Sequence, residues 1–411
     1  MKKLLQINPV VRISTSTGRI MQEIGELAMA CGWESYIAYS KGRDGIKPCK
    51  SKLLPVGNRW SVRWHGIMTR LFDRHGLAST RATKAFIREI ERIRPDIIHI
   101  HNIHGYFLNY KVLFDFLARY GKPVIWTVHD CWLYTGHCYY YSYVRCAKWE
   151  QMCHHCPQKT KFPSSLFWDR SRANFEDKRT AFHALPQTQL HIVPVSEWMR
   201  GEMSRSFLKD YPYQVIHNGI DTAVFAPNDT EAIKEQYHIP RDKHIFLGVA
   251  SIWSDEKGLA EFKQMATQLH EDEVIVMVGV SEAVKKQLPK NIIAIARTEN
   301  IHQLAALYSA ATAFINPTWQ DNYPTVNLES ISCGTPVVTY RTGGSIEAVT
   351  PDTGSIVEQG DVEGLLRAAR AIKQRGKESF TARCRDYALA HFKKEDRYRD
   401  YLALYEKLLT K

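Results

Sequence analysis

The chain contains 411 residues, 44% of them hydrophobic and 24% charged, which excludes a disordered protein and favours two domains over a single core. Its formal net charge of +12 is concentrated in residues 1–200, which contain 30 Lys and Arg against 15 Asp and Glu. This basic half is suited to an anionic partner, such as nucleic acid, an anionic membrane surface or a phosphorylated small molecule.

The first residues, MKKLLQINPVVR, predict a β-strand and not a secretory signal, because their apolar run is short. No apolar run reaches the roughly 18 residues needed to span a bilayer. We therefore expect a cytoplasmic protein, associated with the inner face of the cell membrane, whose nine cysteines lie in a reducing compartment.

Short apolar runs alternate with helical patterns along the chain. The strand candidates are KLLQI, ESYIAY, PDIIHIH, PVIWTVH and LHIVPV, then HIFLGVA, EVIVMVG, NIIAIA, TAFINP and PVVTY; the helical patterns include residues 80–93, 258–270, 301–311 and 361–374. This alternation predicts two parallel sheets with crossover helices. A Pro- and Gly-containing stretch near 208–228 divides the domains, 1–212 and 213–393, and we expect the helix at 394–411 to pack back on the first.

Ligands of open parallel sheets bind at the carboxyl ends of the strands, so the residues after TAFINP are candidates. In TWQDNYPTVNLES, Pro324 is expected at the start of a helix, with the amides of Thr325 and Val326 pointing outward to a diphosphate. Glu329 is then placed to accept hydrogen bonds from a ribose, and Asp321 to hold sugar hydroxyls. The alternative is an N-capping Asp and a solvated Glu.

Histidines gather at the end of another predicted strand, in HIHNIHGY. Alternate histidines point to one face of a strand, so His99 and His101 with His104 form a candidate metal site. We favour the other interpretation, in which His101, Asn102 and His104 line the acceptor side of the site.

A loop at 136–158 contains Cys138, Cys146, Cys153 and Cys156 in the spacing C-x7-C-x6-C-x2-C. The final C-x2-C is typical of a zinc knuckle, and four thiolates form a closed tetrahedral site. Two disulfides and four free thiols are the alternatives. A closed site leaves no position for substrate, so we expect the loop, with or without zinc, to shape the acceptor side and not to catalyse.

Further motifs resemble the retaining glycosyltransferases of family four, which have the GT-B fold. TWQDNYPTVNLES resembles their E-x7-E element; the other matches are STGRI (16–20), WTVHD (126–130), VIHNGIDTAVFAP (215–227), ASIWSDEKGL (250–259), SCGTPVV (332–338) and RTGGSIEAV (341–349). HNIHGYFLN, the cysteine loop and DRHGLAS are similar to the exopolysaccharide and colanic acid biosynthesis subfamily. The resemblance implies an α/β protein with two Rossmann-like doubly wound domains facing a central cleft.

The resemblance also implies roles for single residues. Lys257 is expected to bind the donor diphosphate and His129 to touch the donor sugar, so that with Asp321 they form the catalytic set. Gly18 and Tyr323 are expected in the donor site.

Two residues depart from the family pattern. Asp321 stands where the usual residue is Glu, and its side chain is one methylene shorter. Ser251 stands in the donor site where most members carry a phosphate-binding Arg, which leaves Lys257 as the main cation there.

The reaction implied is transfer of a sugar from a nucleotide sugar, UDP- or GDP-linked, to an acceptor hydroxyl with retention at the anomeric carbon. Fixed donors at the diphosphate would stabilise the charge that develops there. The departing phosphate would take the acceptor proton, so we expect neither a protein base nor a required cofactor. The expected acceptor is a lipid-linked saccharide in cell-surface polysaccharide assembly.

The segment NRWSVRWHGIMTRLFDRHG carries aromatic residues near helical spacing among Arg59, Arg63 and Arg70. It is a candidate for binding an anionic membrane surface; an ordinary packed helix is the alternative.

Two other functions were weighed against a transferase. A zinc-containing nucleic-acid-binding protein explains the charge and the cysteines but leaves residues 215–360 without a role, so we expect no nucleic-acid partner. A nucleotide-sugar epimerase of the same fold would turn over donor without acceptor.

Overall fold

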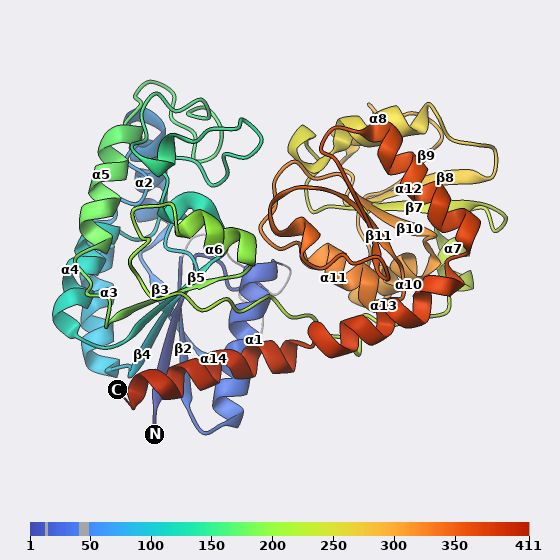
Figure 1. Ribbon diagram of the computed structural model, residues 1–411. Coiled ribbons are helices and arrows are strands. Elements are labelled where there is room, and N and C mark those ends of the chain that lie inside the picture. Colours follow the sequence, from blue (N-terminus) through green and yellow to red (C-terminus); the bar gives the residue numbers. More distant parts are fainter. Residues whose placement is uncertain (13–14, 41–48, 411) are drawn as a thin grey trace. The chain divides into compact units, whose positions relative to one another are not determined.

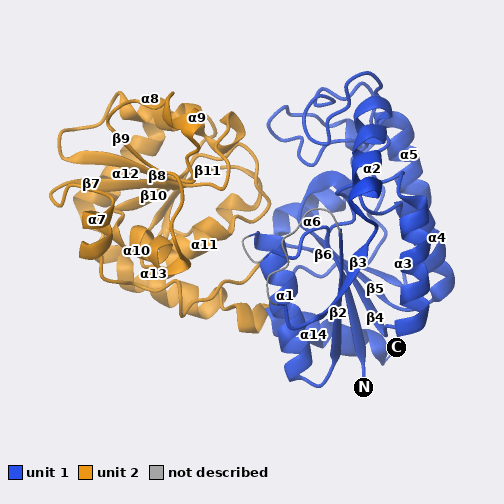
Figure 2. Ribbon diagram, turned by 180° about the vertical axis from the view of Figure 1, so that it is seen from behind, with its two compact units in different colours: residues 1–217, 398–411 blue, residues 218–397 orange. Residues whose placement is uncertain are grey.

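The computed structural model describes residues 1–12, 15–40 and 49–410. The chain divides into two compact units, residues 1–217 with 398–411 (unit 1) and residues 218–397 (unit 2), drawn separately in Figure 2. The predicted boundary lay after residue 212, whereas the structure divides the chain after His217. The last helix, α14 (Lys394–Leu409), begins in unit 2 and belongs to unit 1 from Tyr398 onward.

Unit 1 is a six-stranded parallel sheet with the order β3-β2-β1-β4-β5-β6 (Figure 1). Its strands are β1 (Lys3–Ile7), β2 (Glu34–Ser40), β3 (Lys52–Val56), β4 (Ile97–Ile100), β5 (Val124–Val128) and β6 (Leu190–Pro194). Its helices are α1 (Ser16–Ala30), α2 (Arg59–Phe72), α3 (Thr80–Ile93), α4 (Tyr110–Tyr120), α5 (Ser171–Phe182) and α6 (Glu197–Met203), with short 3₁₀ turns at Cys131–Leu133 and Lys148–Glu150. This strand order is that of a doubly wound fold, in which the winding reverses between β1 and β4.

The strands of unit 1 are apolar on both faces because helices cover both. Leu5, Ile98 and Trp126 belong to the core that includes residues of α3 and α4. Their neighbours Leu4 and Ile97 belong to a second core, which contains residues of α1 and α14. Successive side chains thus alternate between two buried faces, as expected for a parallel sheet.

Helix α14 is fastened to unit 1 by tyrosines as well as by its apolar side chains. The Tyr398 hydroxyl donates to Glu23 at 2.7 Å, Tyr401 accepts from Thr127 at 3.0 Å, and Tyr405 lies 2.7 Å from Nδ1 of His99. The C-terminal helix therefore forms part of the core of unit 1.

Unit 2 repeats the architecture with the order β12-β11-β10-β7-β8-β9, again all parallel. Its strands are β7 (His244–Val249), β8 (Glu273–Val278), β9 (Ile292–Ile295), β10 (Ala313–Asn316), β11 (Val337–Tyr340) and β12 (Gly354–Val357). Its helices are α7 (Glu231–Gln236), α8 (Leu259–Ala266), α9 (Glu282–Lys285), α10 (Ile301–Ala310), α11 (Thr325–Ser332), α12 (Val362–Arg375) and α13 (Glu378–His391), with 3₁₀ turns at Asp255–Lys257 and Gly343–Ile346. The winding reverses between β7 and β10.

All ten predicted strands are present, and the four predicted helices are α3, α8, α10 and α12. Strands β3 and β12 were not predicted from the sequence. Both are edge strands, and both lack a continuous apolar run: β3 (KLLPV) contains Pro55, which an edge tolerates, and β12 (GSIV) begins with a glycine. No helix within the described residues has the length and apolar content that crossing a bilayer requires.

Candidate active site

In unit 2 the loops that follow β7 and β10 meet where the winding of the sheet reverses. The amide of Trp319 donates to the carbonyl of Glu256 at 2.9 Å. Gly258, at φ 82°, lies so close to Pro317 that an added Cβ would come within 2.4 Å of the Pro317 ring. A glycine is therefore required for the two loops to lie side by side, at the position where doubly wound sheets bind ligands.

These loops bring together two of the predicted catalytic residues. Nζ of Lys257 lies 2.7 Å from Oδ2 of Asp321, although the residues are 64 positions apart in the sequence. The Lys257 side chain is 39% exposed and that of Asp321 18% exposed. The pair is thus accessible to a ligand, and a diphosphate would compete with Asp321 for the ammonium group.

Helix α11 begins directly behind this pair. Pro324 is its N-cap residue and makes no side-chain capping hydrogen bond, and Thr325 and Val326 are partly exposed in the first turn. The first amides of a helix have no partner within the helix, and they bind anions well. The uncapped start of α11 therefore follows three residues after Asp321, the partner of Lys257.

Two other predicted donor residues are less accessible. Glu329 is 5% exposed and accepts a hydrogen bond from the Tyr308 hydroxyl at 3.2 Å. Tyr323 is buried, burial raises the pKa of its hydroxyl, and its carbonyl accepts a hydrogen bond from Asn218 at 3.4 Å. Ser251 is exposed in the loop after β7.

A buried polar network that the sequence analysis did not identify supports the start of α11. The side chain of Asn327 donates to the carbonyl of Ser345 at 2.9 Å and accepts from Asn316 at 2.8 Å. The amide of Gly344 donates to the carbonyl of Asp321 at 3.2 Å. The RTGGSIEAV motif is the sequence signal for this contact, because it forms the turn that holds the loop of Asp321.

In unit 1, buried histidines occupy the corresponding end of the sheet. The side-chain amide of Gln6 donates to the carbonyl of Met21, so its oxygen must accept from Nε2 of His101, at 3.0 Å. Nδ1 of His101 lies 3.1 Å from Nε2 of His129. Burial lowers the pKa of His129 to about 4 and the pKa of His101 well below its usual value, so both rings are neutral near pH 7.

Neutrality fixes the tautomers of this chain. His101 donates from Nε2 to Gln6 and therefore accepts at Nδ1, so His129 donates from Nε2 and is the tautomer without a proton on Nδ1. His101 is buried with both ring nitrogens engaged, which makes it a support for His129 and leaves it no direct contact with an acceptor.

The other predicted residues of unit 1 lie nearby. Nε2 of His104 lies 2.8 Å from Oδ2 of Asp130. Burial by itself raises the pKa of the Asp130 carboxyl, but His104 and the amide of Trp132 lower this pKa by more, so the net shift is downward. Asn102 is partly exposed after β4. Gly18 lies in the first turn of α1, where an added Cβ would come within 2.3 Å of the carbonyl of Arg12.

Comparison with known proteins identifies the chain. Residues 29–224 match the family profile described as Glycosyltransferase Family 4, and residues 243–374 match that described as Glycosyl transferases group 1. The chain is a family-four-like glycosyltransferase. WcaC of Escherichia coli (strain K12), provisionally named a colanic acid biosynthesis glycosyl transferase, is 22% identical over 89% of this chain and 90% of its own length. The chain spans about half the length of several other curated relatives.

Solved structures confirm the GT-B fold of this glycosyltransferase. A sucrose-phosphate synthase from Thermosynechococcus elongatus superimposes with a TM-score of 0.73 at 15% identity, covering 100% of both chains. Anabaena Alr3699/HepE in complex with UDP-glucose superimposes with a TM-score of 0.68 at 13% identity, covering 99% of this chain and 100% of its own. At these identities the likeness shows the fold alone.

The four cysteines of the loop in this glycosyltransferase are unpaired by disulfides. A hydrogen bond joins the thiols of Cys138 and Cys156, and it lowers the pKa of Cys156 to about 7. Among the described residues, three metal-binding atoms lie within 4.8 Å of one another only at His270, Asp272 and Glu273, so no three of the four sulfurs lie that close together.

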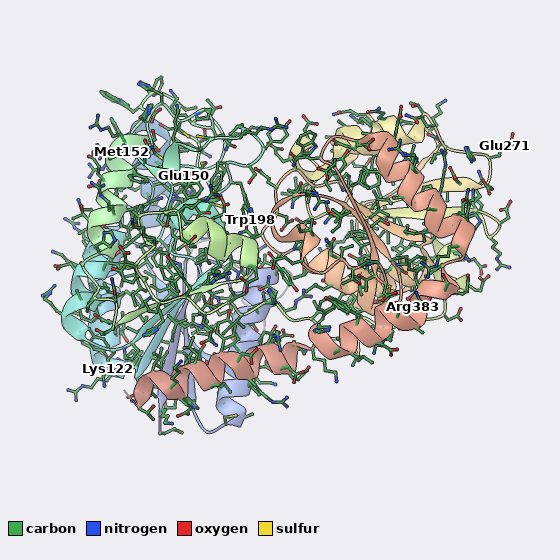
Figure 3. The ribbon with its side chains drawn as sticks, in the orientation of Figure 1. Lys122, Glu150, Met152, Trp198, Glu271 and Arg383 are labelled. Carbon is green, nitrogen blue, oxygen red and sulfur yellow. The ribbon has the colours of Figure 1, made fainter. Side chains whose placement is uncertain are left out.

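The loop is fixed to unit 1 by its other side chains. Glu150, labelled in Figure 3, accepts a hydrogen bond from Arg205 at 2.5 Å, and Trp149 is buried. The Lys178 ammonium group is buried beneath the loop and donates to the carbonyls of Trp132 at 2.6 Å and Thr135 at 2.8 Å. These contacts agree with a loop that shapes a surface.

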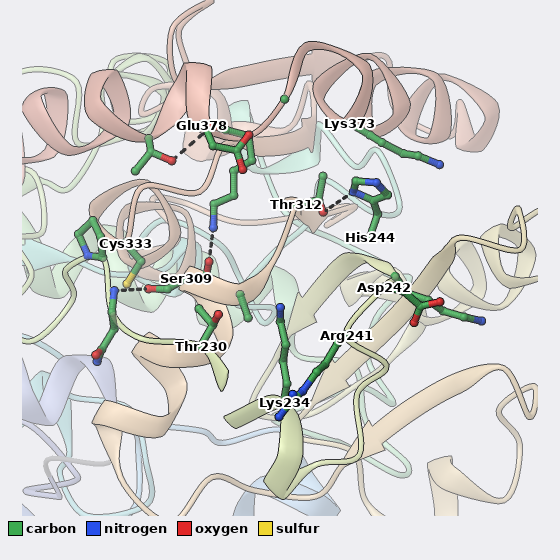
Figure 4. Close-up of a pocket in the computed structure, with 17 residues that line it drawn as sticks. Thr230, Lys234, Arg241, Asp242, His244, Ser309, Thr312, Cys333, Lys373 and Glu378 are labelled. Carbon is green, nitrogen blue, oxygen red and sulfur yellow. Dashed lines mark hydrogen bonds between the residues drawn. The ribbon is translucent and has the colours of Figure 1, made fainter. Parts of the chain in front are cut away.

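A cavity of about 530 Å³ in unit 2, shown in Figure 4, is not this site. His244 and Thr312, which line it, stand at the amino ends of β7 and β10. The pair Lys257 and Asp321 follows the carboxyl ends of the same strands. Lys373, also in the lining, pairs with Asp272 at 2.7 Å. Pocket size alone therefore does not locate the donor site.

Proposed function

We propose that this glycosyltransferase transfers a sugar from a nucleotide-sugar donor to an acceptor hydroxyl with retention of anomeric configuration. The observation that carries the proposal is the ion pair of Lys257 and Asp321 beside the uncapped start of α11, where the winding of the sheet reverses. A ribonucleoside diphosphate needs a cation, helix amides and an acceptor for its ribose, and this loop pair supplies all three kinds of group.

The mechanism follows from where charge develops. As the glycosidic bond stretches, negative charge collects on the leaving diphosphate, where Lys257 and the amides of Thr325 and Val326 stabilise it. Asp321, released from Lys257 by the diphosphate, holds hydroxyls of the sugar. The leaving phosphate oxygen accepts the proton of the acceptor hydroxyl on the same face, which gives retention without a protein base or a divalent ion.

The remaining roles are divided between positioning groups. His129, held by His101, contacts the donor sugar. Glu329, held by Tyr308, accepts the ribose hydroxyls. The donor is UDP-linked in this proposal, with GDP as the second choice; a structural neighbour bound to UDP-glucose supports the first.

The acceptor in this proposal is a lipid-linked saccharide, and the product enters a cell-surface polysaccharide. The similarity to WcaC over 89% of the chain supports this assignment. The acceptor would be met at an anionic membrane surface, to which the basic residues Arg59, Arg63 and Arg70 are attracted.

A structural zinc ion belongs to the proposal as a component of the cysteine loop. Cys138, Cys146, Cys153 and Cys156 supply four thiolates, the donor type that zinc prefers, and zinc would draw the sulfurs together. The ion would stiffen the loop. Metal analysis of the purified protein should find about one zinc per chain, and a zinc-free protein with an unchanged melting temperature would exclude it.

A thermal-shift screen against UDP-, GDP- and dTDP-sugars tests the donor assignment, because a ligand of the folded state raises the melting temperature. UDP-sugars should give the largest shift. Turnover of donor without acceptor would indicate the epimerase, and NMR of the product would show whether the anomeric configuration is retained. Inversion would overturn the mechanism.

A further inference from the structure

Two segments of unit 1 expose large apolar side chains to solvent. Of the exposed large hydrophobic residues in the described part of the chain, all but Met1, Tyr143, Val144 and Ile252 lie in α2 or in residues 162–168: Trp60, Trp64, Ile67 and Phe72 in the helix, and Phe162, Leu166, Phe167 and Trp168 in the loop. Trp60 is 75% exposed and Phe167 71% exposed. Exposed patches of this kind mark interaction sites or aggregation liabilities.

Helix α2 has its polar face inward and its apolar face outward. Its buried residues are His65 and Thr69, and His65 accepts from the amide of Gly76 at 3.0 Å and bonds Ser79 at 2.9 Å. Trp60, Trp64 and Ile67 share the solvent side at helical spacing. A helix that served only to pack on its own unit would bury this apolar stripe. Helix α2 therefore packs on unit 1 through its polar residues and leaves its apolar stripe to the solvent.

The two segments form one continuous surface. The amide of Leu166 donates to the carbonyl of Arg70 at 2.7 Å, which joins the loop to the last turn of α2. The loop has a defined shape, because Ser165 is buried and its hydroxyl donates to the carbonyl of Trp168 at 2.7 Å. Figures 1 and 2 both show α2 beside the loops at this end of unit 1.

The surface is cationic as well as apolar. Residues 58–72 and 157–168 contain no Asp or Glu, and they contain Arg59, Arg63, Arg70, Lys159 and Lys161. The Arg63 guanidinium lies over the Trp60 ring, 5.4 Å from its centroid. Trp and Phe with interspersed cations are the composition of helices and loops that lie in the headgroup region of anionic membranes.

We infer that α2 and residues 162–168 together form a docking surface for an anionic lipid bilayer. The inference adds the loop to the helix and rests on the proposed function in one respect, namely that a lipid-linked acceptor is met at the bilayer. The aromatic side chains enter the headgroup region while the arginines and lysines pair with lipid phosphates. Pairing with the same surface of a second copy of the chain is disfavoured, because neither copy would have a carboxylate there to pair with the five cations of the other.

Cosedimentation of the full chain with vesicles of phosphatidylcholine, with and without phosphatidylglycerol, tests the surface. The protein should bind the anionic vesicles, and Phe167→Ser/Trp168→Ser in the loop should weaken binding at least about tenfold. Trp60→Ser/Trp64→Ser in the helix should do the same. Unchanged binding of the loop variant, with weakened binding of the helix variant, would overturn the joint surface.

A charge-matched pair of variants separates lipid attraction from general charge. Arg59→Ser/Arg63→Ser/Arg70→Ser should lose binding to anionic vesicles, whereas Lys285→Ser/Lys286→Ser/Lys290→Ser removes three exposed cations of unit 2 and should retain it. Equal losses in both variants would overturn a specific surface. A wild-type dimer that the aromatic variants convert to monomer, with no vesicle binding, would assign the surface to a second copy of the chain.

The melting-temperature shift caused by UDP is measured on the same variants. The surface variants should keep the full shift, since they lie outside unit 2. Vesicle binding without any UDP shift would contradict the proposed function and leave the surface standing. If UDP shifts the melting temperature of the wild-type protein but the protein does not bind anionic vesicles, the docking surface is contradicted and the proposed function stands.

Discussion

The two units share one strand order and yet present different chemistry where the winding of each sheet reverses. Unit 2 presents a partly exposed ion pair, Lys257 with Asp321, beside a helix start. Unit 1 presents a chain of neutral groups, in which Gln6 and His101 are buried and His129 is partly buried. The same strand order thus carries different side chains in the loops of the two units.

The charged groups of unit 2 and the neutral groups of unit 1 suit different parts of a nucleotide sugar. A diphosphate is charged in every state of the reaction, so it is bound best by a cation and fixed dipoles. A neutral sugar offers hydroxyls, for which an uncharged imidazole with one donor and one acceptor is suited. In the proposed function unit 2 therefore binds the charge and unit 1 orients the sugar.

The largest expected effect is that of removing the cation of unit 2. Lys257→Ala should lower the transfer rate by about 10²–10³-fold and abolish most of the UDP thermal shift, because it removes the cation from the diphosphate. His129→Ala should lower the rate but keep the UDP shift, because it contacts only the sugar. Lys290→Ala, an exposed lysine of the same unit, is the control and should match the wild type. Equal UDP shifts in Lys257→Ala and the control would contradict the division.

A second variant tests how unit 2 is stabilised. Glu273 is buried and binds Arg370 at 2.9 Å and Lys373 at 3.1 Å. Glu273→Ala leaves Arg370 without its carboxylate and leaves Lys373 with Asp272 alone, which should lower the free energy of unfolding of unit 2 by about 3 kcal/mol. Denaturant unfolding should show an earlier transition for unit 2 and an unchanged one for unit 1. A single shifted transition would show that the units unfold together.

Much of the fold was predictable because buried parallel strands are continuous apolar runs. All of the strands in the middle of both sheets were identified, and the two that were missed are edge strands whose residues are partly solvated. An edge strand needs only one buried face, so its sequence carries a weaker signal.

The sequence proposes residues for the candidate site, but it does not reveal their contacts. The approach of Lys257 to Asp321 depends on the fit of Gly258 against Pro317, a contact between two loops that no spacing reveals. Alternation predicts that His99, in β4, and His101, just beyond its end, face the same side, and the centroids of their rings lie 4.1 Å apart. The contacts of His99 with Tyr401 and Tyr405 of α14, however, come from residues about 300 positions later in the chain. The joining of Leu166 to Arg70 is likewise a tertiary contact.

A pH titration should sharpen the comparison between the units. Burial lowers the pKa of His99 to about 3 and of His101 well below its usual value, so the unfolded chain binds more protons than unit 1 does below about pH 6.5. Unit 1 should therefore lose stability as the pH falls from about 6.5, by up to ~1.4 kcal/mol per pH unit for each histidine.

Unit 2 should respond in a lower window. The pKa of Glu273 is lowered to about 2. Burial by itself raises this pKa, but the hydrogen bonds from Arg370, the amide of His270 and Lys373 lower it by more. Its contribution is present above the unfolded pKa near 4.5 and is lost only as the pH falls toward 2. Thermal unfolding between pH 7 and 5 should therefore lower the transition of unit 1 and spare that of unit 2. Parallel loss in both would contradict this assignment.

The smallest expected effect concerns the hydroxyl of Tyr405, which joins α14 to His99. Tyr405→Phe keeps the ring in its core but leaves Nδ1 of buried His99 without the bond at 2.7 Å, which should cost about 1 kcal/mol of unit 1 stability. Tyr398→Phe is the matched control, because its partner Glu23 is only part-buried and can be hydrated in its place, so the loss should be smaller. Denaturant midpoints of unit 1 measure both. A larger loss in the control would mean that the bond between Tyr398 and Glu23 holds α14 more strongly than the bond between Tyr405 and His99. Burial beneath α14, and not the bond to Tyr405, would then keep His99 neutral.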